Sequence, residues 1–126
     1  MTLQEAIDRV DEMKANMMSV RMKVGFLTEI DQLIHDEIVM KHEHTAAQAV
    51  KPAYNEEADL MTELIVPDPY GRDVYLYWLM SRIDDQNQED GRYNVDRAKF
   101  EHAYRTMSDW WTREHMPVTR NREIRI

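Results

Sequence analysis

Imidazole and carboxylate side chains gather near the middle of the chain and could in principle bind a metal ion. They are His35, Asp36, Glu37, His42, Glu43 and His44. A helical dinuclear carboxylate site uses Glu-x-x-His on two helices, and a zinc hydrolase uses His-Glu-x-x-His. Neither pattern occurs in this sequence. We therefore interpret the cluster as a solvated helix end followed by a loop, and we predict no metal and no cofactor.

A second group of carboxylates could bind a divalent cation or perform acid–base chemistry. It consists of Asp84, Asp85, Glu89 and Asp90. Acidic residues at the polar end of a helix are usually solvated, and Arg82 and Arg92 are near enough in sequence to pair with them. The chain has no cysteine and no glycine-rich phosphate loop, and no serine is placed as a nucleophile elbow. We therefore predict no catalytic residue and no enzymatic activity.

The adjacent Trp110 and Trp111 could stack on nucleic-acid bases. The charge of the chain argues against that function, because 24 acidic and 16 basic residues give a net charge of −8. Residues 1–112 carry 22 acidic and 12 basic groups, whereas residues 113–126 have a net charge of +2. Since an acidic body repels phosphate, we predict that both tryptophans pack in the core and that the basic end is available for an acidic partner.

The size and composition fit one domain made in a reducing compartment. A chain of 126 residues can bury one core, and the absence of cysteine excludes a disulfide framework. The start of the sequence lacks the basic residues and the apolar run of a signal peptide, and no later window resembles a membrane-spanning helix. We therefore expect a soluble protein of the cytoplasm with no membrane partner.

Two amphipathic helices are predicted in the first forty residues. Thr2 and Glu5 match a capping box, and Lys14 lies off the apolar stripe that follows, so we expect it to be solvated. That stripe consists of Leu3, Ala6, Ile7, Val10, Met13 and Met17. Ser19 is the predicted cap of a second helix with the stripe Val20, Val24, Leu27, Ile30, Ile34 and Ile38. The short break between the helices favours an antiparallel pair.

Residues 42–63 show no sustained period and contain Pro52, so we predict a long loop with one short turn at residues 46–50. Loops of this length are uncommon in compact domains and are usually functional or mobile. Residues 64–66 are aliphatic and end at Pro67, which favours an extended segment laid across the core.

Residues 67–117 hold nine of the eleven aromatic residues and predict two helices joined by a polar loop. Asp68 is the predicted N-cap of the first helix. Residues 74–80 are apolar on every side, so they need neighbours on both flanks, from this chain or from another copy. Beyond Ile83 the helix turns polar, and we expect this end to protrude into water.

Gly91 is the predicted helix stop, and Asn94 is the predicted cap of the last helix. This helix has the clearest apolar stripe of the chain, formed by Phe100, Ala103, Tyr104, Met107, Trp110 and Trp111. Residues beyond Pro117 alternate like an extended strand that lacks a partner strand. We therefore predict an all-α, four-helix bundle-like domain over residues 1–117, with a long loop at 42–63 and an extended C-terminal tail at 118–126.

Several segments together resemble a known family. They are TLQEAIDRVDEMKANMMS, LIVPDPYGRDVYLYWLMSRIDDQN, RYNVDRAKF and AYRTMSDWWTREHMPV. The chain is similar to small structural proteins from the head and tail modules of tailed bacteriophages, in particular to head–tail connector or adaptor proteins. The resemblance covers nearly the whole chain and consists of packing motifs, with no characteristic chemical group.

The resemblance implies an all-helical subunit of the virion neck, made in the host cytoplasm, that forms a ring, typically dodecameric, beneath the portal protein. Its other partner would be a tail or stopper protein, reached through the C-terminal tail. DNA would pass nearby without specific binding, because the body is acidic. The predicted subunit-interface residues are Val74, Tyr75, Tyr77 and Trp78. The predicted partner-binding residues are Arg120, Arg122, Ile124, Arg125 and Ile126.

Two alternatives remain open at this point. One is a phage-encoded metal-dependent enzyme or regulator that uses His35, His42 and His44. The other is a monomeric module that interacts with a host protein.

Overall fold

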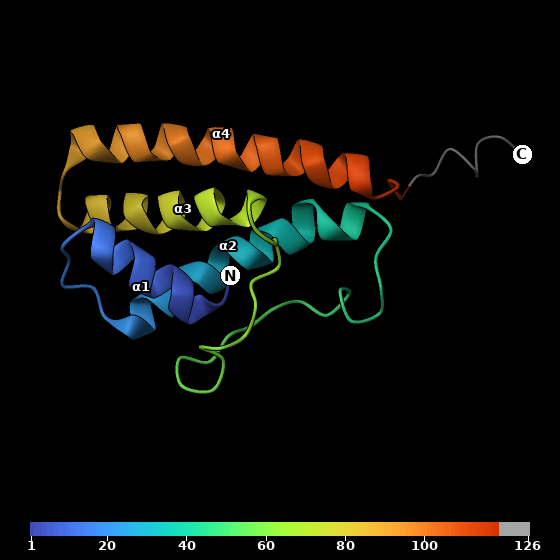
Figure 1. Cartoon of the computed structure of the whole chain (residues 1–126), viewed down its shortest axis with the longest axis horizontal. Coiled ribbons are helices and arrows are strands. Elements are labelled where there is room, and N and C mark those ends of the chain that lie inside the picture. Colours follow the sequence, from blue (N-terminus) through green and yellow to red (C-terminus); the bar gives the residue numbers. More distant parts are fainter. Residues whose placement is uncertain (119–126) are drawn as a thin grey trace, which may run out of the picture.

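The computed structural model describes residues 1–118, and within them the fold is all-α. It has four α-helices and one short 3-10 helix in this range and no β-strand: α1 (Leu3–Met13), α2 (Val20–Glu37), η1 (Val39–Lys41), α3 (Tyr70–Gln86) and α4 (Asp90–Glu114). Figure 1 shows α3 and α4 side by side as an antiparallel hairpin, with α1 and α2 on the side of α3 away from α4. The predicted all-α class is confirmed for this part of the chain.

The central helix is α3, which packs along α4 and also contacts α1 and α2. This position explains why its first turns are apolar on every side. Val74, Tyr75 and Leu79 have no exposed surface, and Ile83 near the end of the helix is also fully covered. Both flanks of α3 are therefore covered by this chain itself, and the burial that we predicted for residues 74–80 requires no second copy.

The start of α1 has the predicted capping box. The Thr2 hydroxyl accepts a hydrogen bond from the Glu5 amide at 3.1 Å, and the Glu5 carboxylate accepts one from the Thr2 amide at 2.9 Å. The buried residues of this helix follow the predicted stripe, from Leu3 to Val10. Met17 departs from the prediction, because α1 ends at Met13 and Met17 lies exposed in the connection to α2.

The predicted second helix is also confirmed, with its N-cap at Ser19. The Ser19 hydroxyl accepts a hydrogen bond from the Met22 amide at 3.1 Å. Its buried face contains Val24, Leu27 and Ile34, which belong to the predicted stripe.

The long segment between η1 and α3 is tied to α1 and α2 by hydrogen bonds. The Leu3 and Gln4 amides donate to backbone carbonyls of Thr62 and Leu60 at 3.2 and 2.8 Å. The Gln32 side chain on α2 donates to the Pro52 carbonyl at 2.9 Å. Leu64 and Val66 at the end of the segment are buried in the core, as predicted.

The connection between α3 and α4 is shorter than we predicted. The last helix begins at Asp90, so Gly91 and Asn94 lie inside α4, and their predicted roles as helix stop and cap are wrong. Gln88 makes the turn instead, with a φ of 59°. At the other end of α3, the helix begins at Tyr70 with Pro69 as its N-cap residue, so the prediction of Asp68 as the cap is also wrong.

The polar end of α3 is partly buried, so the expectation that the helix beyond Ile83 protrudes into water is wrong in part. The Asp84 carboxylate has no exposed surface, and the Lys14 ammonium lies 2.6 Å from its Oδ1 atom and 2.7 Å from Glu89 Oε2. This pairing arises because α1 packs beside this end of α3 and brings Lys14 with it. Arg82 does not pair with these carboxylates, and its guanidinium lies over the ring of Trp78.

The chain after α4 pairs with residues that follow η1. The Glu43 amide donates to the Met116 carbonyl at 2.7 Å, and the Val118 amide donates to the Lys41 carbonyl at 2.8 Å. His42 and Pro117 form an isolated antiparallel bridge between these two segments. The beginning of the predicted tail therefore has a pairing partner in its own chain, which the sequence pattern did not reveal.

Candidate functional site

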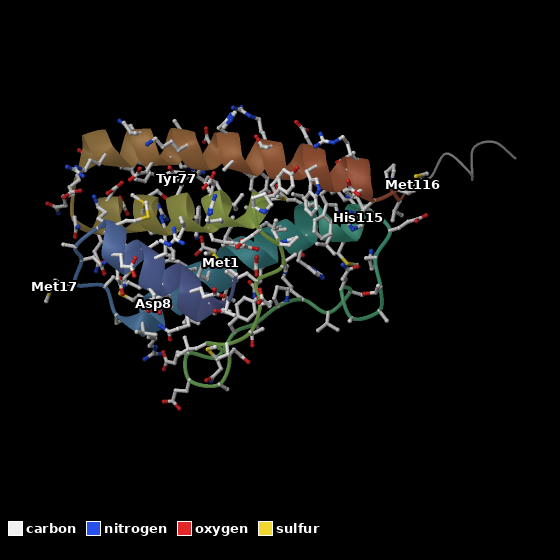
Figure 2. The ribbon with its side chains drawn as sticks, in the orientation of Figure 1. Met1, Asp8, Met17, Tyr77, His115 and Met116 are labelled. Carbon is white, nitrogen blue, oxygen red and sulfur yellow. The ribbon has the colours of Figure 1, made fainter. Side chains whose placement is uncertain are left out.

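Two adjoining hollows form a groove on one side of the seam between α3 and α4, which we call the α3–α4 groove. The first has a volume of about 620 Å³ and is lined by Tyr70, Asp73 and Tyr77 of α3 and by Lys99, His102 and Thr106 of α4. The second has a volume of about 520 Å³ and also includes Lys99, together with Met13, Met80, Val95 and Asp96. Figure 2 shows Tyr77 between the ribbons of α3 and α4.

Helical spacing places these side chains on matching faces. Tyr70, Asp73, Tyr77 and Met80 recur every three or four residues on α3. Val95, Lys99, His102 and Thr106 recur in the same way on α4. Such spacing puts each set on one face of its helix. When α3 and α4 pack along each other, these two faces line the same seam. The sequence period therefore shows that the four α4 residues share one face, next to the apolar stripe.

Aromatic contacts fix the walls of the groove. The Tyr70 ring stacks on Trp110, with ring centroids 4.6 Å apart and an angle of 11° between the planes. The Lys99 ammonium lies 5.4 Å from the centroid of the Tyr77 ring, within the range of a cation–π interaction. Because each tyrosine is held by a residue of α4, the apolar surface of the groove is preformed.

The charge of the groove differs from that of the chain as a whole. Lys99 and Arg92 place two cations on its α4 side, and Asp73 is the acidic residue of its α3 side. Asp96 at the base is buried, and burial, followed by a hydrogen bond and the negative charge of Asp84, raises the pKa of Asp96 to about 6. The groove therefore offers cations on the surface of an acidic protein.

Three of the four predicted subunit-interface residues lie inside the core of this chain. Val74 and Tyr75 have no exposed surface, and Trp78 is 6% exposed, with its indole N–H donating to the Phe26 carbonyl at 2.8 Å. These three side chains therefore leave almost no surface for a second copy, because α1, α2 and α4 already cover them. Tyr77 is the exception, since it is half-buried and lines the α3–α4 groove.

The predicted partner-binding residues fall outside the described part of the chain. They are Arg120, Arg122, Ile124, Arg125 and Ile126. Their assignment stays a prediction.

The three histidines of the metal hypothesis each bind a backbone carbonyl. His35 Nε2 donates to the Gln48 carbonyl at 3.0 Å, His42 Nδ1 donates to the Ile38 carbonyl at 2.7 Å, and His44 Nδ1 donates to the His42 carbonyl at 2.7 Å. Within residues 1–118, no three or more histidine, aspartate or glutamate side chains are arranged to hold a metal ion. The contacts of His35 and His42 instead hold the segment after α2 in place.

The carboxylates and tryptophans near the hairpin also have structural environments. Asp84 and Glu89 meet the Lys14 ammonium, whereas Asp85 and Asp90 are exposed. Trp111 is 3% exposed and Trp110 is half-buried against Tyr70. Core packing, which we predicted for both tryptophans, accounts for their positions.

Among the described residues, none of the helices is sufficiently long and apolar to cross a bilayer. Comparison with protein-family models, with curated proteins and with solved structures gave no match to this chain.

Proposed function

We propose that the protein is a structural subunit of the virion neck, a head–tail connector that acts by forming a ring between the portal and the tail. The subunit would be a four-helix bundle-like domain with an extended C-terminal tail. The observation that carries this proposal is the α3–α4 groove, a preformed apolar surface with cations beside it, on a chain whose core is already complete. Such a surface suits assembly with other proteins.

The sequence resemblance supports the same conclusion, and it supplies the identity of the partners. These would be the portal protein on one side and a tail or stopper protein on the other, with a dodecameric ring of this chain between them. The acidic body supports a position beside passing DNA, because negative charge repels phosphate.

The pairing of the chain after α4 also supports a role in docking. Hydrogen bonds from Glu43 and to Lys41 fix the position and direction in which the backbone leaves the domain at residue 118. A partner-binding segment that starts from a fixed point loses less conformational entropy on binding than one joined by a free linker.

The experiment is native mass spectrometry of the purified, untagged chain over a concentration series, alone and mixed with the portal protein of the phage that encodes it. We expect a ring mass, or a ladder of masses that leads to one, in at least one of the two conditions. The instrument should resolve a bound metal ion, so that the same spectra test the metal-dependent alternative.

A chain that stays monomeric in both conditions would contradict the proposal. A variant that ends at residue 117 provides the second comparison. We expect it to keep the helical circular dichroism of the full chain and to lose binding to the portal or the tail protein.

A further inference from the structure

A second partly exposed apolar surface lies on the outer face of α2, which we define by Met22, Glu29 and Leu33. Met22 and Leu33 are 41% and 42% exposed, and Glu29 lies between them in sequence and is also exposed. At 100° per residue the three positions fall on one side of the helix, opposite the buried face that contains Leu27. This outer face has no covering element in residues 1–118.

The outer face of α2 and the α3–α4 groove lie on opposite sides of the hairpin. Met13 at the end of α1 lines the groove, so the groove is on the α1 side. The Trp78 indole donates to the carbonyl of Phe26 in α2. Trp78 lies about 100° around α3 from Tyr77, so α2 packs at the edge of the α3–α4 seam opposite to the edge that Tyr77 lines. In Figure 1, α1 passes in front of α2. One copy therefore cannot place its own α2 in its own groove, but it can offer one surface to each of two neighbours.

The groove is long enough to take the outer face of α2. Its α4 wall runs from Gly91 to Thr106, which are fifteen residues apart, whereas Met22 and Leu33 are eleven residues apart on α2. At 1.5 Å per residue, the groove is about 22 Å long and the α2 face is about 16 Å long. A helix that lays apolar side chains into a groove is a recurring mode of recognition between proteins.

The charges of the two surfaces are complementary. Lys99 in the groove and Glu29 on α2 form no ion pair with any other side chain of residues 1–118. Each is thus a charge without an ion-pair partner in this part of the chain, and each lies beside apolar side chains. Opposite charges at the edge of an interface favour the correct register and exclude contacts between like surfaces.

We propose that the outer face of α2 of one copy docks into the α3–α4 groove of the next copy, with Leu33 against Tyr77 and Glu29 facing Lys99. The occupant of the groove is therefore a second copy of this chain. Because the two surfaces differ, the contact is heterologous, and its repetition leads to a ring when the rotation between copies closes. This inference deepens the proposed function and rests on it, since it specifies how the copies meet.

Charge reversal tests the contact. We expect Lys99→Glu and Glu29→Lys each to weaken self-association by about tenfold or more, because each places like charges face to face. The double variant carries both changes in every subunit, so each contact regains an opposite pair, and we expect it to assemble again. Assembly is measured by native mass spectrometry, with and without the portal protein.

Matched control variants carry the same charge changes elsewhere. Arg105 lies on the side of α4 away from α3, and Glu12 lies on the exposed face of α1. We expect neither Arg105→Glu nor Glu12→Lys to alter assembly. His102→Glu provides a second groove variant in case Lys99→Glu disturbs folding, because His102 is exposed. Circular dichroism and thermal unfolding check that every variant keeps its fold.

Cysteine cross-linking tests the direction of the contact. The natural chain contains no cysteine, so introduced thiols have no competitors. Leu33→Cys and His102→Cys in the same chain should give a ladder of disulfide-linked oligomers after oxidation. Each substitution alone should give none, because a head-to-tail contact does not bring two copies of the same position together.

The outcomes separate this inference from the proposed function. Rings that survive both charge reversals would overturn the α2–groove contact and leave the connector function standing. Loss of portal binding with self-association intact would assign the groove to the portal and would also overturn the contact. Cross-linking by Leu33→Cys alone would replace it with a symmetric α2–α2 contact. A chain that is monomeric under all conditions would overturn the contact and the connector function together.

Discussion

The Tyr75 hydroxyl on α3 donates a hydrogen bond of 2.6 Å to Asp31 Oδ1 on α2, and both side chains are fully buried. The same hydroxyl accepts a hydrogen bond from the Val66 amide at 2.9 Å. Tyr54 and the Ile65 amide donate to Asp31 as well. Burial raises the pKa of Asp31, and these donors act against that rise. One carboxylate therefore joins α2, α3 and the segment before α3.

We expect Tyr75→Phe to lower the free energy of unfolding by about 1–3 kcal/mol, because it removes the hydrogen-bond partner of the Asp31 Oδ1 atom and of the Val66 amide. Urea unfolding followed by circular dichroism measures the change. Tyr93→Phe is the matched control, since Tyr93 has no hydrogen bond from its hydroxyl within residues 1–118 and is only half-buried. If Tyr75→Phe and Tyr93→Phe lower the free energy of unfolding equally, the hydrogen bonds around Asp31 do not stabilise the fold.

Gly71 is the position where a methyl group would collide with backbone. An added Cβ would lie 2.2 Å from the Val66 carbonyl oxygen, whereas the same atom at Gly25 would have no neighbour within 4 Å. We expect Gly71→Ala to lower the free energy of unfolding by about 1–3 kcal/mol, because backbone must move. Gly25→Ala should instead raise it by up to about 1 kcal/mol, because alanine favours a helix.

Thermal unfolding of the two alanine variants in one buffer makes the comparison direct. Both changes add one methyl group to a helical glycine, so their chemistry is the same and only the surroundings differ. A similar effect of the two substitutions would mean that the approach of α3 to residue 66 is looser than the structure describes.

Local signals were sufficient to predict the first two helices. The side-chain caps of Thr2 and Ser19 depend on residues within one turn, so the sequence contains all that is needed to recognise them. The aromatic hairpin was predictable for the same reason, because the apolar stripe from Phe100 to Trp111 is periodic.

Tertiary contacts decided the features that the sequence pattern missed. Lys14 is charged and lies off the stripe of α1, and its burial depends on Asp84, which is seventy residues later in the sequence. Asn94 has the residue type of a cap, but packing on α3 extends α4 past it to Asp90. For the candidate site, Tyr77 was predicted at an interface, whereas its partner across the groove, Lys99, could be paired with it only once the hairpin register was known.

The Lys14–Asp84 pair should contribute strongly to stability. Asp84 has no exposed surface, so the Lys14 ammonium, 2.6 Å from its Oδ1 atom, is the main compensation for its charge. We expect Lys14→Met to lower the free energy of unfolding by about 3 kcal/mol. This value is at the lower end of the losses that follow when a buried ion pair is broken, because Glu89 leaves one side of this pair open to water. Urea unfolding measures the loss.

Lys51→Met is the control for this substitution, because Lys51 pairs with Asp36 at the surface and both side chains are more than half exposed. We expect a much smaller effect there, since water screens an exposed pair. Replacing both members of the buried pair, as Lys14→Met with Asp84→Leu, should recover part of the lost stability. If Lys14→Met costs no more than Lys51→Met, the buried pair is not stabilising.

Asp96 gives the protein a dependence of stability on pH. Its pKa is raised from an ordinary value of 3.8 to about 6, by burial first and then by Asp84, while the nearby cations of Lys14 and Lys99 act in the opposite direction. A raised pKa means that the folded state binds this proton more tightly than the unfolded state does. The stabilisation from Asp96 is therefore complete below pH 3.8 and is lost as the pH rises through about 6.

We expect Asp96→Asn to remove this dependence, because an amide does not titrate. The free energy of unfolding of the variant, relative to that of the natural chain, should rise between pH 4 and pH 7. Other groups with shifted pKa values, such as Asp31, are present in both proteins, so their contributions cancel in the difference. Asp90→Asn, at an exposed position in the first turn of α4, should give a difference that stays nearly constant over the same range. A constant difference for Asp96→Asn as well would mean that Asp96 titrates alike in the folded and unfolded chains, and that the contact with Asp84 does not hold its proton.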